Sequence, residues 1–188
     1  MLTVDTLKKQ YSFSFSDDDR LFWDNILETA KASVFKYIGL TDKGHISATY
    51  YFTNLENEYF VLPYSPLISI ESVKCGTYDE LVNGKGEVIK NYIADNQTGI
   101  LTIYDKYKIY HTDDKIRVDY TAGYTDETLP KPLEVAIVYT VRNIAKLLQT
   151  ENLGVSALSQ DGADVQTQDY IPFAIYNILK NYTIWRIK

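Results

Sequence analysis

Apolar side chains recur at helical spacing toward both ends of the chain. Between 131 and 150 they fall at three- and four-residue steps, and Pro132 suits a first turn, where its missing N–H does no harm. A second stripe runs through 17–38, with Ser16 as its candidate cap and Gly39 as its candidate end. We therefore predict two long amphipathic helices. Their predicted buried residues are Leu21, Phe22, Ile26, Leu27, Ala30, Val34, Tyr37, Ile38, Leu133, Ile137, Val141, Ile144 and Leu148.

Two shorter stretches also have a helical pattern. Residues 3–10 place Leu7 on an inward face, and either Thr3 or Asp5 is the candidate cap. A proline opens the other stretch, 171–182. Its predicted buried residues are Ile171, Ile175, Ile178, Leu179 and Tyr182.

The stretch between these helices alternates apolar and polar residues, which is typical of half-buried strands. In 115–121, for example, Ile116, Val118 and Tyr120 fall on one face. About six or seven short antiparallel strands predict a small sandwich or a curled sheet, in which the first two strands form a hairpin. The predicted strands are 45–53, 58–62, 67–75, 88–94, 100–104 and 115–121, and the predicted turns are 54–57, 83–86 and 95–99.

Together these elements predict an α+β fold: an antiparallel helical bundle that carries an inserted antiparallel β subdomain. The stretch 151–169 is long and polar and has few large apolar residues, which is typical of a flexible or functional loop. The predicted parts are a helical body at 1–39 and 126–188, with helices near 3–10, 17–38, 131–150 and 171–182, a β-rich insert at 40–125, a flexible loop at 151–169 and a C-terminal arm at 183–188.

The charge of the chain excludes one class of function. A net charge of −6 argues against a nucleic-acid binder that works through a basic patch. The three carboxylates at 17–19 face the positive end of a helix dipole, and we prefer that interpretation to a cation site. The chain has no secretory signal pattern and no apolar run of the roughly 18–20 residues that span a bilayer, so we expect synthesis in the cytoplasm and no membrane contact.

Side chains for catalysis or metal binding are few. The single cysteine, Cys75, excludes an internal disulfide and a cysteine-based metal site, and its apolar strand predicts a buried thiol. His45 and His111 lack ligand-spaced neighbours, and no phosphate-loop, dinucleotide, nucleophile-elbow or zinc-protease motif occurs. We therefore predict a non-enzyme without catalytic, cofactor or metal residues. The 17 tyrosines suit strand packing and also raise the expectation of extensive protein–protein contact.

Three pieces of sequence carry a resemblance to a known family. They are 2–8 with 17–21 at the opening, the proline-led strand 64–73, and the strand-to-helix junction 118–124 with 129–133. In their order and spacing they resemble the head–tail connector (adaptor) proteins of tailed bacteriophages and related gene-transfer particles, in the long form with a β-rich insert. The resemblance covers nearly the whole chain, which departs from the family in its high tyrosine content and in the length of 151–169.

The resemblance implies a structural role in the virion. Such proteins form a ring, usually of twelve copies, under the portal protein at the head–tail junction. The ring extends the DNA exit channel and docks the next neck or tail-completion protein, while DNA passes without specific binding. The protein would be made in the cytoplasm of the host bacterium.

Partner contacts are expected near the end of the chain. We expect Ile184, Trp185 and Ile187 in the arm to reach a neighbouring protein, although they could equally fold back on the subunit's own core. The other expected partner-binding residues are Gln160, Asp161 and Tyr170.

Three alternatives stay open at this point. One is another phage neck or tail-completion protein, which differs in location but not in chemistry. The second, from a different class, is a carbohydrate-binding module with a stacking platform of Tyr50, Tyr51, Tyr59 and Tyr64, although helices at both ends of the chain argue against it. The third is an enzyme, which would require a pocket of convergent carboxylates.

Overall fold

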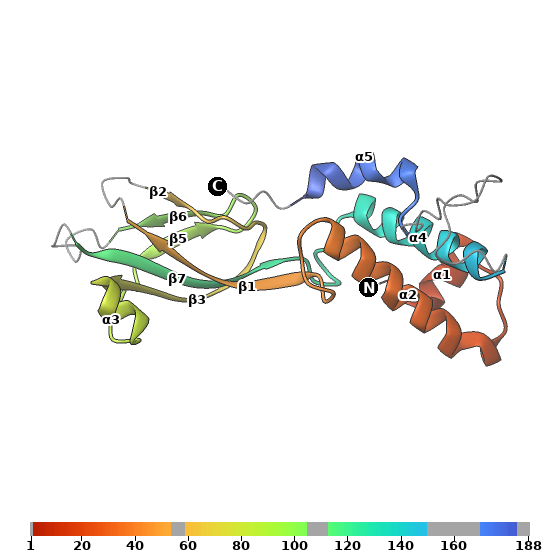
Figure 1. Cartoon of the computed structure of the whole chain (residues 1–188), viewed down its shortest axis with the longest axis horizontal. Coiled ribbons are helices and arrows are strands. Elements are labelled where there is room, and N and C mark those ends of the chain that lie inside the picture. Colours follow the sequence, from red (N-terminus) through yellow and green to blue (C-terminus); the bar gives the residue numbers. More distant parts are fainter. Residues whose placement is uncertain (1, 54–58, 105–112, 150–169, 184–188) are drawn as a thin grey trace, which may run out of the picture. The chain divides into compact units, whose positions relative to one another are not determined.

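The computed structural model describes residues 2–53, 59–104, 113–149 and 170–183. Its helices and antiparallel sheets confirm the predicted α+β class. The chain divides into two compact units (Figure 1): a helical unit, Met1–Gly44 with Asp126–Thr183, and a β unit, His45–Thr125. The antiparallel order of the predicted bundle stays a prediction.

Helix α1 (Val4–Tyr11) opens the helical unit with a clear cap. The Thr3 Oγ1 atom accepts a hydrogen bond from the Thr6 backbone N–H at 3.2 Å, so Thr3 rather than Asp5 is the cap. Leu7 is fully buried, as predicted. The helix ends at Ser12, a non-glycine residue in the left-handed conformation.

Helix α2 (Arg20–Tyr37) follows a 3₁₀ turn at Asp17–Asp19. Ser16 stands at the cap position, but its hydroxyl donates to Asp19 Oδ2 at 2.8 Å and does not accept from the backbone, so the predicted cap is wrong in this detail. The predicted end is confirmed: Gly39 adopts a φ of 91°, and Leu40 N donates across it to Phe35 O at 2.9 Å.

The predicted buried stripe of α2 is only partly right. Leu21 is 73% exposed, and Phe22 and Tyr37 are also exposed. Each residue turns an α-helix by about 100°, and Leu21 precedes the buried Ala30 by nine residues. The two side chains therefore lie on opposite sides of α2, and Leu21 cannot belong to the buried stripe. The predicted residues that are buried are Ile26, Leu27, Ala30, Val34 and Ile38.

Helix α4 (Lys131–Gln149) packs against α2 through the stripe predicted for it, with one correction. Leu133, Ile137, Val141 and Ile144 are buried, whereas Leu148 is exposed. The helical period places Leu147 inward at the end of the helix instead.

The last predicted helix is a short α-helical turn, α5 (Tyr176–Leu179), between the 3₁₀ turns η3 (Phe173–Ile175) and η4 (Lys180–Tyr182). Ile171, Ile175 and Leu179 are buried as predicted, and the other two stripe residues, Ile178 and Tyr182, are half-buried.

Tyr11 ties the end of α1 to α4 within the helical unit. Its hydroxyl donates to Glu134 Oε1 at 2.7 Å and accepts from Lys131 Nζ at 2.8 Å, while its backbone carbonyl accepts from Arg142 at 2.7 Å. Partial burial raises the pKa of Tyr11, as does Glu134, whereas Lys131 lowers it. The tyrosine therefore remains a neutral donor to the carboxylate at physiological pH.

Two antiparallel sheets make up the β unit (Figure 1). In the larger sheet, β7 lies between two long strands and pairs with both. The strand order is β1 (His45–Phe52), β7 (Lys115–Gly123), β3 (Leu67–Gly76) and β4 (Glu87–Val88) in the larger sheet, and β2 (Tyr59–Val61), β6 (Ile100–Ile103) and β5 (Tyr92–Asp95) in the smaller one.

Both sheets contribute to one hydrophobic cluster. Phe60, Leu101 and Ile103 come from the smaller sheet, and Val118 and Tyr120 come from the central strand of the larger one. Cys75 is buried in this cluster, and burial raises the pKa of its thiol to about 11. A core shared between two sheets makes the β unit a sandwich, one of the two forms predicted.

The predicted hairpin between 45–53 and 58–62 is wrong. Strand β1 pairs with β7 in one sheet, and β2 pairs with β6 in the other; the predicted turn at 54–57 lies outside the described residues. The predicted strand 88–94 also divides, because β4 and β5 belong to different sheets. The predicted turn at 95–99 is confirmed, since it joins the paired strands β5 and β6.

Helix α3 (Tyr78–Val82) was not predicted, although the sequence contains its signal. Thr77 and Glu80 form a reciprocal capping box: Thr77 Oγ1 accepts from Glu80 N at 3.4 Å, and Glu80 Oε2 accepts from Thr77 N at 3.0 Å. A threonine followed three residues later by glutamate marks such a start. Gly84, in the predicted turn, adopts the positive φ that ends this segment.

The corrected stripe of α4 predicts unequal costs for two similar substitutions. Ile144 is 4% exposed and Leu148 is 36% exposed, one helical turn away. Ile144→Ala should destabilise the helical unit by about 2–4 kcal/mol through the cavity it leaves, whereas Leu148→Ala should cost under about 1 kcal/mol. Thermal unfolding of both variants checks this, and equal losses would contradict the burial described.

Candidate interaction surfaces

A polar network covers the outer face of the larger sheet around Asp119. Its carboxylate accepts hydrogen bonds from Thr49 at 2.6 Å, from Ser72 at 2.7 Å and from Arg117 at 2.9 and 3.0 Å. Arg117 also donates to the Leu81 carbonyl at 2.8 Å, which attaches the end of α3 to the sheet. Each of these hydrogen bonds lies within the β unit, so the network stabilises the larger sheet.

The pKa of Asp119 follows from this arrangement. Partial burial raises the pKa, but the hydrogen bonds from Thr49, Ser72 and Arg117 outweigh it, and the net pKa lies below its usual range. The carboxylate is therefore charged at physiological pH and holds the guanidinium of Arg117 in place.

The outer face of the smaller sheet is largely apolar, with Thr102 and Asp95 as its polar residues. Tyr59 on β2 lies opposite Thr102 on β6, which lies opposite Ile93 on β5, so the three side chains share one row. Tyr59 is 60% exposed and Ile93 is 61% exposed, and the exposed Val61 and half-buried Ile100 extend the face. An exposed apolar sheet face is typical of a surface that binds another protein.

Aromatic side chains gather at the start of α2 in the helical unit. The Trp23 ring stacks on Phe15 with centroids 5.0 Å apart, and Phe13 and Phe22 meet it edge-on at 5.6 and 5.7 Å. Phe22 is the exposed member, next to the exposed Leu21. This cluster stabilises the entry to α2 and leaves two apolar side chains at its surface.

A second aromatic group links α5 to the end of α2. The Tyr37 and Tyr176 rings lie 5.0 Å apart, and Phe173 meets Tyr176 edge-on at 6.1 Å. Phe173 is 87% exposed, the largest value among the described large apolar side chains. Such an exposed aromatic ring is suited to act as an anchor in a partner's pocket.

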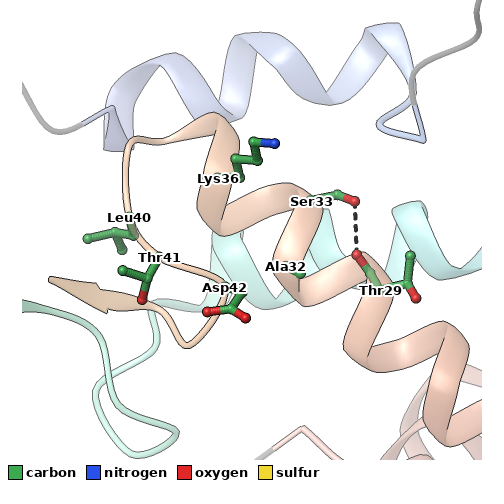
Figure 2. Close-up of a pocket in the computed structure, with 7 residues that line it drawn as sticks. All are labelled: Thr29, Ala32, Ser33, Lys36, Leu40, Thr41 and Asp42. Atoms are coloured by element: carbon green, nitrogen blue, oxygen red, sulfur yellow. Dashed lines mark hydrogen bonds between the residues drawn. The ribbon is translucent and has the colours of Figure 1, made fainter.

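A hollow of about 500 Å³ lies on the helical unit, between the second half of α2 and the loop after it; Figure 2 draws the residues that line it. Two of its hydroxyls are engaged within α2: Thr29 and Ser33 donate their hydroxyl hydrogens to backbone carbonyls one turn earlier, at 2.8 Å each. The residues that line it are Thr29, Ala32, Ser33, Lys36, Leu40, Thr41 and Asp42.

Of the residues predicted to bind partners, only Tyr170 lies among the described residues. It is half-buried, and its carbonyl accepts a hydrogen bond from Asn143 of α4 at 2.9 Å, so its backbone anchors the last segment. The others lie outside the described residues: Gln160, Asp161, Ile184, Trp185 and Ile187, with the loop 151–169 and all of the arm after Thr183.

The four tyrosines of the carbohydrate-binding alternative do not form one platform. Tyr50 and Tyr51 are neighbours on β1 and point to opposite faces. Tyr50 packs against the core beside Phe52, and Tyr51 contacts Tyr78 of α3. Tyr59 belongs to the other sheet. The geometry therefore disfavours a stacking site built from these side chains.

Two further classes of site were sought in the parts of the chain that the structure describes. There, no group of three or more His, Cys, Asp or Glu side chains has an arrangement that could hold a metal ion. Nor do the described helices include one long and apolar enough to cross a membrane.

Exposed apolar and aromatic side chains are thus the prominent surface features of both units among the described residues. Residues 1–185 match the model of the head completion protein (HCP) family, and the chain belongs to that family. Its family name describes a structural part of the phage head, so the chain is a structural component of a phage particle. No curated protein matches the chain.

Solved structures of gene transfer agent (GTA) particles contain similar chains. One, from the virion of the native particle, has 14% identity and a TM-score of 0.49, covering 93% of this chain and 82% of that one. A chain from the neck of the empty particle, computed with C6 symmetry, has 15% identity and a TM-score of 0.49, with coverage of 98% and 88%. A third, from the neck of the native particle, computed with C12 symmetry, has 14% identity and a TM-score of 0.48, with coverage of 92% and 87%.

The Asp119 network predicts a pH-dependent stability. The pKa of Asp119 is lower in the folded state than its unfolded value of 3.8. The charged carboxylate therefore stabilises the fold fully above pH 3.8, and this stabilisation is lost as the pH falls through the folded-state pKa. Asp119→Asn should cost about 1–3 kcal/mol at pH 7 and should flatten the loss of stability on acidification. Urea unfolding from pH 7 to pH 3 checks this, with the exposed Asp79→Asn of α3 as control; equal slopes in wild type and Asp119→Asn would contradict it.

Proposed function

We propose that this protein is a head–tail connector that forms a ring of twelve copies under the portal protein. The ring extends the DNA exit channel and docks the next neck or tail-completion protein at the head–tail junction. The single observation that supports this role best is the family match over residues 1–185. The role requires no catalysis, so the protein acts as a non-enzymatic part of the virion.

The acidic character of the chain suits a DNA channel. A basic lumen would hold DNA by releasing counterions from its phosphates, whereas DNA must slide through a neck. The net charge of −6 and isoelectric point near 4.9 favour passage without specific binding. The apolar outer face of the smaller sheet, around Tyr59 and Ile93, is a surface on which another neck protein could dock.

Antibody labelling of particles tests the location. Gold-labelled antibody against the full chain should mark the head–tail junction in electron micrographs, and quantitative mass spectrometry should find twelve copies per particle. Particles from a host in which the gene is deleted serve as the control. Label along the tail or at its tip would favour the alternative tail-completion role, and unlabelled particles would contradict the proposal.

The predicted arm supplies a separate test of partner binding. Removing 183–188 should leave a folded protein that no longer joins particles, because Ile184, Trp185 and Ile187 would then be missing from its contact with a neighbour. Circular dichroism measures folding and particle mass spectrometry measures joining. Lys188→Ala, which keeps the apolar residues, is the matched control. Normal joining by the shortened chain would overturn the arm hypothesis.

A further inference from the structure

The helical unit exposes apolar side chains at both ends of α2. At its start, Leu21 and Phe22 stand beside the carboxylates of Asp17–Asp19; we call these residues the acidic apolar patch. At its end are aromatic rings from α2 and from the last segment, with one exposed lysine next to Tyr37 in the sequence and another four residues after Tyr176. This second surface, the basic aromatic patch, consists of Lys36, Tyr37, Phe173, Tyr176 and Lys180.

The two patches are well separated on the same unit. Tyr37 follows Leu21 by sixteen residue steps, which at 1.5 Å per step is about 24 Å along the helix. Figure 1 shows α5 beside the later part of α2, and the 5.0 Å contact between Tyr37 and Tyr176 fixes it there. One patch therefore cannot be an extension of the other.

The patches have opposite charge. The sequence 17–28 contains five carboxylates and one arginine, while the basic aromatic patch contains two lysines. One carboxylate, Asp42, lines the same hollow as Lys36. Lys8 holds Asp17 at 2.9 Å and Arg20 holds Asp5 at 3.0 Å, and both are surface pairs, which contribute little and can exchange for a partner's charge. Lys31 also holds Glu28 at 2.9 Å, but the Lys31 side chain is only 14% exposed.

A local explanation accounts for only part of the acidic apolar patch. Carboxylates are favourable in the first turn of a helix because they face the positive end of its dipole, and this explains Asp17–Asp19. The dipole gives no reason to expose Leu21 and Phe22, whose apolar surface is unfavourable in water. A partner that covers these two side chains explains both features.

We propose that the acidic apolar patch of one copy binds the basic aromatic patch of the next copy in the ring. The inference rests on the ring of the proposed function and specifies its interface. A closed ring requires two different, mutually complementary patches on every subunit, and the helical unit carries such a pair. Phe173 supplies the central aromatic anchor, and the carboxylates near Leu21 face Lys36 and Lys180.

Cross-linking in assembled particles tests the pairing directly. Asn25→Cys and Asn177→Cys place thiols at exposed positions beside the two patches without removing an apolar side chain. The buried Cys75 does not compete. With a short bis-maleimide, the double variant should give a ladder of trimers and larger species, because each copy joins two neighbours. Each single variant should give no ladder.

The outcomes separate the two proposals. Suppose that particles contain the protein at the head–tail junction and yet yield no cross-linked species larger than a dimer. That result would overturn the pairing and leave the proposed ring intact. Absence of the unaltered protein from that junction would overturn the proposed function instead.

Charge reversal gives a second test. Lys36→Glu with Lys180→Glu should reduce the copies per particle at least about tenfold, and so should Asp18→Lys with Asp19→Lys. All four changes together should restore assembly, because the charges are again complementary. Lys85→Glu with Lys90→Glu, on the exposed surface of the β unit, is the matched control and should have no effect. Failure of the combined variant to recover, while it folds normally by circular dichroism, would overturn the pairing.

Discussion

Strand β7 is hydrogen-bonded along both edges, and the arrangement of the β unit depends on it. Ile116 and Val118 point into the core, so a slip of one residue would bury Arg117 and Asp119 instead. Asp119 opposes such a slip from the outer face. In the register of the sheet it lies opposite Thr49 on β1 and Ser72 on β3, and it accepts a hydrogen bond from each. The same strand is thus fixed by apolar packing on one face and by a charged network on the other.

The strongest local patterns were enough to predict elements but not their partners. The strand near 115–121 and the helix near 131–150 were predicted because each has a long, uninterrupted period. The partner of β1 could not be found in the same way, since β7 lies about 70 residues further along the chain. A nearby strand and a short connection favoured a hairpin, but pairing depends on which faces the whole sandwich must bury. Helix α3 was missed for the opposite reason: it is too short to show a period, and only its capping box indicates it.

The residues missed at the interaction surfaces show a further limit of sequence patterns. Leu21, Phe22 and Tyr37 were assigned to the core of α2 because they are apolar and lie in a helix. An apolar side chain gives the same signal whether its own chain or another copy will cover it. The structure, in which these three side chains are exposed while Ala30 and Val34 are buried, shows which of them the subunit's own core covers. Phe173 could be recognised from neither period nor motif, and its exposure is the reason to consider it.

Like charges restrict how exposed patches of this kind can pair. Two copies that brought their acidic apolar patches together would place Asp17–Asp19 of one against the same carboxylates of the other, and this repulsion opposes a symmetric dimer. Two basic aromatic patches would repel for the same reason. Pairing an acidic apolar patch with a basic aromatic patch avoids both repulsions, and it joins copies head to tail. Head-to-tail contacts close into a ring only if each copy is rotated by the right angle relative to the last; otherwise they form an open filament. The surfaces of the subunit can therefore select the neighbour, while a symmetric template such as the portal would select closure.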